Sequence, residues 1–297
     1  MPGSVRRHLF FIATACATAF FPAYAQSQTF PPLVSPASHI SAPGKIVSAQ
    51  LVTPDLASTE KFYGALLGWT FQDIPVRHGR VAQILNQGKA VGIIVEHPFT
   101  NPDQRPSWLP IVATPDADAT ARQGSTLGGK ILFRPRDIPG YGRETVLSDP
   151  DGAIFLALRA TGGDPPDAAD AIGNWCWSAL LTSDPAKAQD FYGKLFGYQT
   201  ETLASGHVLI SSQGNARGSL NMFPASFPTT ATARWVRFVR VAGVGATAEQ
   251  VASLGGRVVV QPHVDRDGIM VAILADPAGA VFGIMEYPSE TPMGEAK

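Results

Sequence analysis

Two stretches of the sequence decide the fold, because they repeat each other. The first is TPDLASTEKFYGALLG at residues 53–68, and the second is TSDPAKAQDFYGKLFG at residues 182–197. In both stretches a threonine and an aspartate precede an amphipathic segment that contains Phe-Tyr-Gly and ends at a glycine. Aspartate or threonine favours a helix N-cap and glycine a helix C-cap, so each stretch predicts one capped helix.

Further matches follow both stretches in the same order. The matching pairs are AVGIIVEHP (residues 90–98) with ARGSLNMFP (216–224), Trp108 with Trp235, GGKILFRP (128–135) with GGRVVVQP (255–262), and SDPDGAIF (148–155) with ADPAGAVF (275–282). Self-similarity at a fixed period indicates repeated structural units. The two halves of the chain are therefore expected to share one fold.

Each half contains two similar units. In the first unit, an apolar strand at residues 46–52 precedes the helix, and two short strands at 81–85 and 90–95 flank Asn86-Gln87-Gly88, a hairpin-like turn. The pattern restarts at Trp108 with a strand, an alanine-rich helix that ends near Leu127, and strands at 130–133, 145–148 and 153–159. The chain is thus predicted to be α+β, with four β-α-β-β-β units.

Composition shifts mark the boundaries between these parts. Residues 26–44 are rich in Ser, Pro, Thr and Ala without periodicity and predict a flexible linker, and residues 161–173 predict a second linker. We expect one domain at residues 45–160, another at 174–288, and a tail at 289–297.

The amino terminus has the pattern of a secretory signal peptide. Arg6 and Arg7 precede an apolar run at residues 9–21, and Pro-Ala-Tyr-Ala at 22–25 offers a cleavage site after Ala25. The run is shorter than the roughly 20 residues of a membrane helix, so we expect an exported protein, periplasmic or secreted, without a membrane span. Twin-arginine export and lipoprotein processing at Cys16 are the alternatives to this route.

Composition excludes several classes of function. The formal net charge is -1, which argues against nucleic-acid binding, and 45% hydrophobic residues are enough for a sizeable core. The sequence has no Gly-x-Ser-x-Gly, Walker A, His-Glu-x-x-His or Cys-x-x-Cys motif, so hydrolase, nucleotide, zincin and redox functions have no support. After loss of the signal peptide Cys176 is the single cysteine, and we expect it to be buried rather than catalytic.

The repeated motifs resemble those of the vicinal oxygen chelate (VOC) superfamily, which includes glyoxalase I, extradiol dioxygenases and bleomycin-resistance proteins. The resemblance covers roughly residues 45–288 and rests on the Phe-Tyr-Gly motifs, the Gly-Gly pairs and the two Asp-Pro-x-Gly-Ala-x-Phe motifs. It is most similar to the two-domain, CFP-30B-like (glyoxalase-like) branch. The resemblance implies two tandem glyoxalase-like domains, in which paired units form curled mixed sheets around clefts.

In the metalloenzymes of this superfamily, the cleft holds a divalent ion on His, Gln or Glu side chains from four places. The corresponding residues here are Ser48 and Trp177 on the first strands, Leu109 and Val236, Leu156 and Gly283, and the segments VGIIV and RGSLN, in which Asn221 is the polar candidate. These residues lack the usual donors, so we predict no metal and no other cofactor. The alternative is a displaced divalent-metal site that uses Glu96 with His97, His207, or His263 with Asp265.

Alternation along the first strands gives the candidate ligand-binding residues. The resemblance places Ser48, Gln50 and Val52 inside the first cleft, where Gln50 hydrogen-bonds either a ligand or a neighbouring strand. In the second half Trp177, Ala179 and Leu181 take these places, so the second cleft is more apolar and suits planar ligands.

Other candidates have a structural alternative. Arg143 and Arg237 either meet an anionic or aromatic ligand or belong to a solvated face. Trp108 and Trp235 either pack in the core of each half or stack on a ligand.

These observations predict an exported glyoxalase-like protein, a monomer or homodimer, that binds a small, largely apolar molecule without a metal. A metal-dependent lyase, isomerase or dioxygenase with displaced ligands is one alternative, and a non-catalytic interaction module is another. The sequence leaves open whether there is any catalysis, which molecule binds, and whether the units pair within or between the halves.

Overall fold

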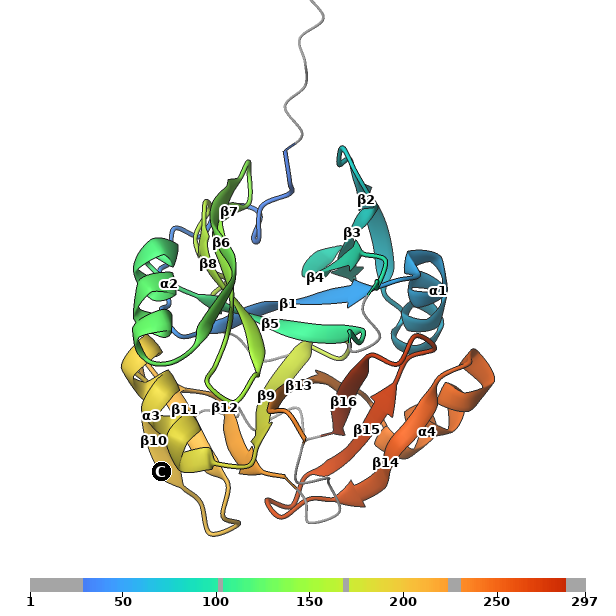
Figure 1. Cartoon of the computed structure of the whole chain (residues 1–297). Coiled ribbons are helices and arrows are strands. Elements are labelled where there is room, and N and C mark those ends of the chain that lie inside the picture. The colour runs from blue at the N-terminus through green and yellow to red at the C-terminus, as the bar shows by residue number, and fades with distance from the viewer. Residues whose placement is uncertain (1–28, 101–103, 168–170, 224–230, 287–297) are drawn as a thin grey trace, which may run out of the picture.

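The chain folds into two domains, each built on one eight-stranded sheet (Figure 1). The computed structural model describes residues 29–100, 104–167, 171–223 and 231–286. Each domain contains two β-α-β-β-β units, so the predicted α+β fold with two tandem glyoxalase-like domains is confirmed. Among the described residues, no helix is long and apolar enough to cross a membrane.

The helices and strands have the following bounds. The first domain contains β1 (Ile46–Thr53), α1 (Leu56–Leu67), β2 (Thr70–Ile74), β3 (Val81–Asn86), β4 (Lys89–Glu96), β5 (Ser107–Ala113), α2 (Ala117–Thr126), β6 (Lys130–Ile138), β7 (Gly142–Ser148) and β8 (Ile154–Ala160). The second contains β9 (Trp175–Thr182), α3 (Pro185–Phe196), β10 (Gln199–Thr202), β11 (Val208–Ser212), β12 (Asn215–Met222), β13 (Arg234–Arg240), α4 (Val244–Val251), the 3-10 turn η1 (Ala252–Leu254), β14 (Arg257–Val264), β15 (Met270–Ala275) and β16 (Val281–Glu286).

The sheets have one topology. Their strand orders are β2-β3-β4-β1-β5-β8-β7-β6 and β10-β11-β12-β9-β13-β16-β15-β14. The first strands of the two units in a half pair antiparallel at the middle of the sheet, β1 with β5 and β9 with β13. The units therefore pair within each half, and the outer strands form two arms that curl to one side in an open, mixed sheet (Figure 1).

The caps predicted from the sequence set the ends of the first helix in each half. Asp55 accepts a hydrogen bond from the Ser58 amide at 2.9 Å, and Gly68 ends α1 with a φ of 71°. Asp184 and Gly197 do the same for α3. The edge strands β2 and β10, which the sequence did not locate, are polar and largely exposed and so have no apolar alternation.

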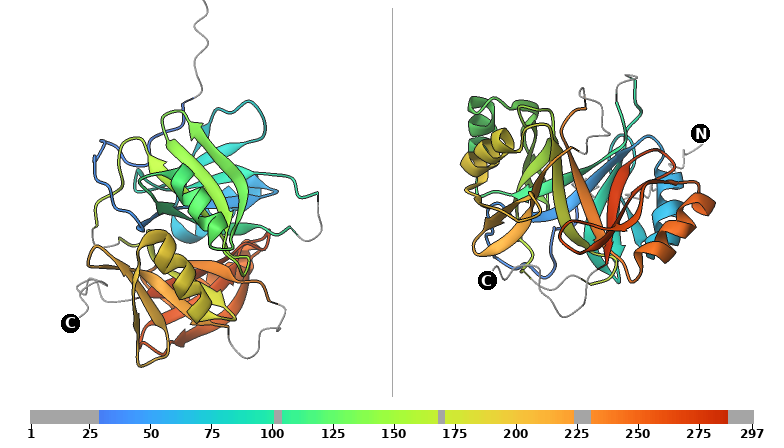
Figure 2. Two further views of the ribbon diagram at one scale, coloured as in Figure 1. Left: turned by 60° about the vertical axis from the view of Figure 1, so that its left-hand side comes forward. Right: turned by 90° about the horizontal axis from the view of Figure 1, so that it is seen from below.

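The convex faces of the two sheets pack against each other, and the helices fill the two ends of this contact (Figure 2). α1 lies beside α4, and α2 lies beside α3. One core joins side chains of α1 to those of α4, β15 and β16, and another joins β7 and β8 to α3. The hydrophobic core is therefore shared between the domains.

The repeated motifs meet inside these shared cores. The Tyr63 hydroxyl accepts a hydrogen bond from Trp108 Nε1 at 2.7 Å and donates one to Asp276 Oδ2 at 3.3 Å. The equivalent Tyr192 hydroxyl accepts from Trp235 Nε1 at 3.0 Å and donates to Asp149 Oδ2 at 3.1 Å. Each tyrosine thus bonds a tryptophan of its own domain and an aspartate of the other.

The described part of the amino-terminal linker, residues 29–44, forms no helix or strand but lies against the first domain. The Phe30 amide donates to the Pro139 carbonyl at 2.8 Å, and the Ala42 amide donates to Asp164 Oδ2 at 2.8 Å. In Figure 1 this dark blue segment descends between the two arms of the first sheet. The predicted signal peptide and carboxy-terminal tail lie outside the described residues.

Candidate functional site

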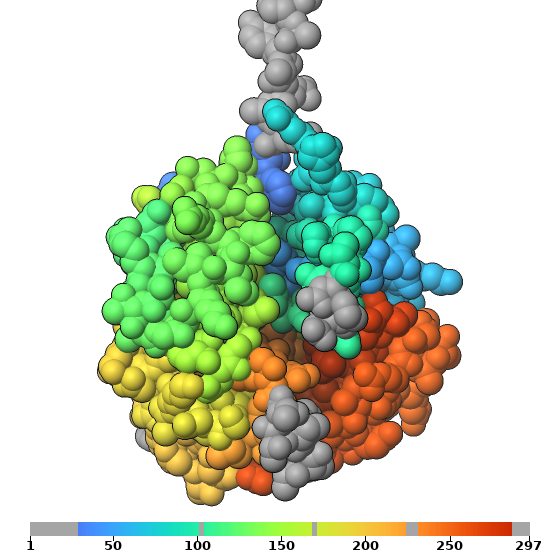
Figure 3. All heavy atoms as spheres, viewed as in Figure 1, coloured from blue at the N-terminus to red at the C-terminus, as the bar shows by residue number. Residues whose placement is uncertain are grey.

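The concave face of the first sheet is an apolar hollow. Side chains paired directly across neighbouring strands point to the same face, which places Ile93, Ile111 and Leu156 together on the concave side. The buried members of this cluster are Ile74, Val81, Ile93, Ile111, Tyr141, Val146, Leu156 and Leu158. In the space-filling view, the molecule is hollowed between the teal arm β2–β4 and the green arm β6–β8, and blue residues are visible inside (Figure 3).

Polar side chains interrupt this apolar face. Gln50 is half-buried opposite Leu109 and Ile93, so its position on the inward face agrees with the alternation. Glu144 lies opposite Leu158, is only 4% exposed, and accepts a hydrogen bond from Arg136 at 3.0 Å. Burial raises the pKa of Glu144, and Arg136 opposes this shift. The first cleft therefore contains an ionisable group in apolar surroundings.

Tyr141 supplies a second polar group to the first cleft. Its side chain is 3% exposed, and its hydroxyl is buried without a hydrogen-bond partner. Burial raises the pKa of Tyr141, and the negative charge of Glu144 adds to the increase, so the hydroxyl stays protonated at neutral pH. A buried hydroxyl without a partner loses its hydration at a cost of about 1–3 kcal/mol, which a ligand could recover.

The amino-terminal segment covers this cleft. Phe30 and Leu33 pack against the concave cluster, and the Phe30 and Tyr141 rings lie 6.3 Å apart. The backbone of this segment passes so close to Gly140 that a Cβ there would lie 2.4 Å from the Phe30 carbonyl oxygen. The first cleft is therefore filled in part by the protein's own chain.

The concave face of the second sheet is also apolar but is more aromatic. Its buried members are Ala179, Val236, Phe238, Val271 and Met285. Half-buried side chains that pack against them are Cys176, Trp177, Leu181, Ile269 and Ile273. Trp177, Ala179 and Leu181 occupy the face that the alternation predicted. The half-buried side chains leave part of this apolar concave face exposed.

Two polar side chains of β12 lie on the same face. Ser219 pairs with Ala179 and Asn221 with Leu181, which places both on the concave side. Trp177 Nε1 donates a hydrogen bond to Ser219 Oγ at 3.2 Å. Asn221 Oδ1 is buried without a hydrogen-bond partner. The second cleft thus combines an oriented indole ring with a neutral hydrogen-bond acceptor.

The residues at the superfamily's metal-ligand places do not fit a divalent ion. Ser48 is buried and its hydroxyl donates to the Val91 carbonyl at 3.2 Å, while Leu109 and Leu156 belong to the apolar cluster. In the second domain, a Cβ at Gly283 would lie 2.2 Å from the ring of Phe238, so an aromatic ring occupies the place of a ligand. Among the described residues, no group of three or more His, Cys, Asp or Glu side chains could hold a metal.

The residues of the displaced-site alternative lie in separate contacts. Glu96 accepts a hydrogen bond from the Leu56 amide at 3.0 Å at the start of α1, and His97 packs near Phe99. His207 Nδ1 lies 2.7 Å from Asp267, and His263 Nδ1 lies 2.9 Å from the Gln261 carbonyl.

The structure places four of the predicted ligand-binding residues on the two concave faces and the other four away from them. Ser48 and Gln50 line the first concave face, and Trp177 and Asn221 line the second. Trp108 and Trp235 are buried in the shared cores, which fits their packing interpretation.

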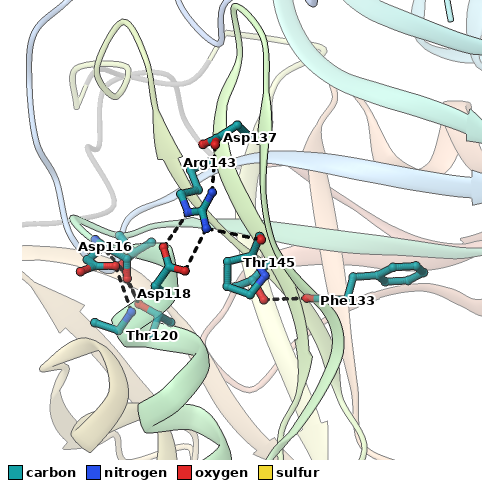
Figure 4. Close-up of polar contacts among 10 residues, drawn as sticks. Asp116, Asp118, Thr120, Phe133, Asp137, Arg143 and Thr145 are labelled. Carbon is teal, nitrogen blue, oxygen red and sulfur yellow. Dashed lines mark hydrogen bonds and ion pairs between the residues drawn. The ribbon is translucent and has the colours of Figure 1, made fainter.

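The two arginines also lie away from both concave faces. Arg237 is buried, donates to Ser178 Oγ and lies 5.2 Å from the ring centroid of Trp175, which itself bonds the first domain through Val91. Arg143 points toward α2, where it forms two hydrogen bonds with Asp118, and it forms another with Asp137 of the neighbouring strand β6 (Figure 4). Both arginines therefore take structural positions.

Sequence reasoning missed three residues of the clefts, Tyr141, Glu144 and Ser219. Tyr141 lies in Pro-Gly-Tyr-Gly, a composition typical of an exposed turn, and Glu144 is a charged residue, a type that usually faces solvent. Alternation from Val146 on β7 would have placed Glu144 on the inward face.

Comparisons with known proteins match both domains to one superfamily. A family model described as Glyoxalase/Bleomycin resistance protein/Dioxygenase superfamily matches residues 45–155, and one described as a glyoxalase-like domain matches residues 177–285. The anthracycline biosynthesis protein DauV of Streptomyces sp. (strain C5) is 29% identical over 84% of this chain and 96% of its own length. The putative glyoxylase CFP32 of Mycobacterium bovis is 28% identical over 80% of this chain and 92% of its own.

Solved structures show the same fold at low identity. The Mn(II)-bound glyoxalase from Novosphingobium aromaticivorans has a TM-score of 0.57 and 15% identity, with 83% of each chain covered. The 2,3-dioxygenase LapB from Pseudomonas sp. KL28 has a TM-score of 0.59 and 13% identity, with 85% of this chain and 97% of that one covered.

Proposed function

The chain belongs to the glyoxalase/bleomycin resistance protein/dioxygenase superfamily, and on that premise we propose that it binds a small, largely apolar molecule in its second cleft without a metal ion. The observation that carries this proposal is the buried Asn221 Oδ1, which has no hydrogen-bond partner and lies on the same concave face as the half-buried Trp177. An acceptor of this kind in an apolar cleft is suited to a ligand that carries one hydrogen-bond donor.

The ligand's body is expected to be a flat ring system. The Trp177 indole is held by its hydrogen bond to Ser219, and aromatic rings pack well against such a fixed face. Val236, Phe238 and Met285 provide the apolar floor. The name of the relative DauV, an anthracycline biosynthesis protein, supports the same class, since anthracyclines are polycyclic aromatic compounds.

The residues at the superfamily's metal-ligand places support metal-free binding. Phe238 over Gly283 and Leu156 in the first domain leave no carboxylate where the superfamily's last-strand ligand would stand. Lewis-acid chemistry at these places would need oxygen or imidazole donors. A metal-dependent lyase, isomerase or dioxygenase stays the alternative that the metal content of the purified protein would reveal.

Export is part of the proposal. The arginines at positions 6 and 7, the apolar run and the Pro-Ala-Tyr-Ala sequence support cleavage after Ala25 and a periplasmic or secreted protein. Amino-terminal sequencing of the mature protein tests this, and a terminus at Cys16 would instead support a lipoprotein.

The binding proposal is tested by calorimetric titration with 2-naphthol, a flat molecule with one hydroxyl donor, and with naphthalene, which lacks the donor. Trp177→Ala should weaken 2-naphthol binding by about 10-fold or more, because the ring loses its stacking face. Asn221→Val should weaken it by about 3- to 10-fold and abolish the preference for 2-naphthol over naphthalene.

Asn215→Val makes the same chemical change on the same strand at its hairpin end, where the side chain bonds the Gln213 carbonyl, and should leave binding unchanged. Equal 2-naphthol affinity in the unmodified protein, Trp177→Ala and Asn221→Val would contradict the proposal.

A further inference from the structure

We propose that the concave face of the first domain is a second binding site, for neutral ring compounds that carry a carbonyl oxygen, and that residues 29–34 are a lid that such a compound displaces. The inference rests on the proposed binding of apolar molecules, but it concerns the other sheet. Each proposal can therefore fail without the other.

The polar anchor of this site is the Tyr141 hydroxyl. It is buried in the apolar cluster of the concave face and has no hydrogen-bond partner. A protonated hydroxyl can donate one hydrogen bond, and a carbonyl oxygen in the cleft would accept it. The carboxylate of Glu144 on the same face disfavours an anionic acceptor, so an uncharged carbonyl oxygen fits the Tyr141 donor better than a carboxylate or phenolate does.

The rim of the cleft offers aromatic surface. Phe133 pairs with Val146 of the concave cluster, yet its side chain is 59% exposed. Figure 4 shows this ring extending from β6 to the side opposite Arg143 and α2. Phe133 lies on the same β6–β7 hairpin as Tyr141 but nearer its other end, so it extends the apolar surface available to a ring compound away from the buried donor.

The lid is attached in a way that permits displacement. From Ser38 onward the segment is tied to the linker after the first domain, through Ser38 Oγ to the Asp164 carbonyl at 2.6 Å and Ala42 to Asp164. Before Ser38, Phe30 and Leu33 contribute apolar packing and Phe30 one backbone hydrogen bond to Pro139. Residues 29–34 could leave the cleft while the chain stays held at Ser38.

Phe30 and Leu33 therefore compete with a ligand for the same apolar surface. A ligand binds only to the fraction of molecules whose lid is open, so its apparent affinity is reduced by that fraction. Weakening the lid should strengthen ligand binding, whereas removing an ordinary wall of the site should weaken it. This opposite sign distinguishes a lid from a wall.

The first experiment uses the unmodified full chain with 1-tetralone, a neutral aromatic ketone, and follows hydrogen exchange of the peptide that contains Phe30. We expect faster exchange of the Phe30 amide when 1-tetralone is added, because displacement breaks its bond to Pro139. Unchanged or slower exchange at saturating 1-tetralone would overturn the lid.

The second experiment measures 1-tetralone affinity in Phe30→Ala/Leu33→Ala, with Ile40→Ala as the matched control on the exposed part of the segment. The double variant should bind about 10-fold more tightly and the control unchanged. Tyr141→Phe added to the double variant should lower its affinity for 1-tetralone by about 3- to 10-fold. It should also remove the preference for 1-tetralone over tetralin, which has no carbonyl. Equal or weaker binding by the double variant, or a preference that survives Tyr141→Phe, would overturn the site.

The two proposals have separate readouts. Trp177→Ala should reduce 2-naphthol binding and leave the 1-tetralone response of the Phe30 amide intact. Loss of both responses in Trp177→Ala would overturn the second site, because it would place both probes in the cleft of the second domain.

Discussion

On the convex side of the sheets, Tyr63, Trp108 and Asp276 have the same hydrogen bonds as Tyr192, Trp235 and Asp149. On the concave side, equivalent places hold different residues. Glu144 of the first domain corresponds to Val271 of the second, and both lie on the inward face. The repeated residues thus assemble the two domains, and the residues that differ set the chemistry of the two clefts.

A similar difference lies at the superfamily's metal-ligand place on the last strand. The first domain has Leu156 packed with Ile111, and the second has Gly283 beneath the ring of Phe238. In the first domain two aliphatic side chains fill the place together, and in the second a single aromatic ring fills it above a glycine. The domains therefore reached apolar clefts through different packing.

The largest loss of stability is expected at the aspartates of the shared cores, whose hydrogen bonds are the same in both domains. Asp276→Ala and Asp149→Ala should each lower the free energy of unfolding by about 3 kcal/mol, since each leaves a buried tyrosine hydroxyl and backbone amides without their acceptor. Chemical denaturation measures the loss.

Asp265→Ala is the control, because Asp265 accepts similar backbone hydrogen bonds without a tyrosine partner and should cost less. The two shared cores would not be equivalent if one of Asp149→Ala and Asp276→Ala lost much of its free energy of unfolding and the other lost none.

The next effect comes from Gly283. Gly283→Ala should lower the free energy of unfolding by about 1–3 kcal/mol, because the new methyl group would overlap the Phe238 ring. Adding Phe238→Leu should restore part of the loss, which thermal unfolding of the single and double variants would reveal. A Gly283→Ala protein as stable as the unmodified one would contradict the packing described for the second cleft.

A smaller, pH-dependent effect is expected at Glu144. Burial raises its pKa in the folded protein, so the folded state binds its proton more tightly than the unfolded state. The stability that this group contributes is full below its unfolded pKa and is lost as pH rises through the folded pKa. Glu144→Gln should therefore gain stability relative to the unmodified protein as pH rises above about 4.3, the ordinary pKa of a glutamate in an unfolded chain.

Denaturation at several pH values measures this difference. Glu201→Gln, at an exposed position on β10, is the control and should show no such trend. A stability difference between Glu144→Gln and the unmodified protein that does not change with pH would contradict the burial of an ionisable group in the first cleft.

The smallest effect is expected at Arg143. Because it bonds Asp118 and Asp137 on the outer side of the first domain, Arg143→Ala should leave the affinities for 2-naphthol and 1-tetralone unchanged. Titration with both probes checks this. Weaker binding of either probe would mean that the cleft extends to this side of β7.

The sequence predicted most of the fold because the repeated residues are tied to local backbone geometry. Asp55 and Gly68 have the cap conformations their positions indicated, and Gln87 and Gly88 form the hairpin turn with positive φ values of 50° and 76°. The polar edge strands β2 and β10 lack any pattern that would locate them. The sequence also could not predict that the units pair within each half, since all four units have similar patterns.

The candidate site was less predictable for a physical reason. Alternation gave the inward positions of Gln50 and Trp177, but it could not show that Tyr63 bonds an aspartate of the other domain, because each half contains both motifs. Tyr141 was missed because its burial depends on Phe30, a residue outside the repeated units. Contacts of this kind depend on the assembled structure.

The central claim is that the protein binds small apolar molecules without a metal ion. Native mass spectrometry of the protein, purified without added ligand from cells that produce the full chain, tests this most directly. We expect the mass of the mature chain with an organic adduct and no divalent ion. A stoichiometric divalent ion in either domain would contradict it.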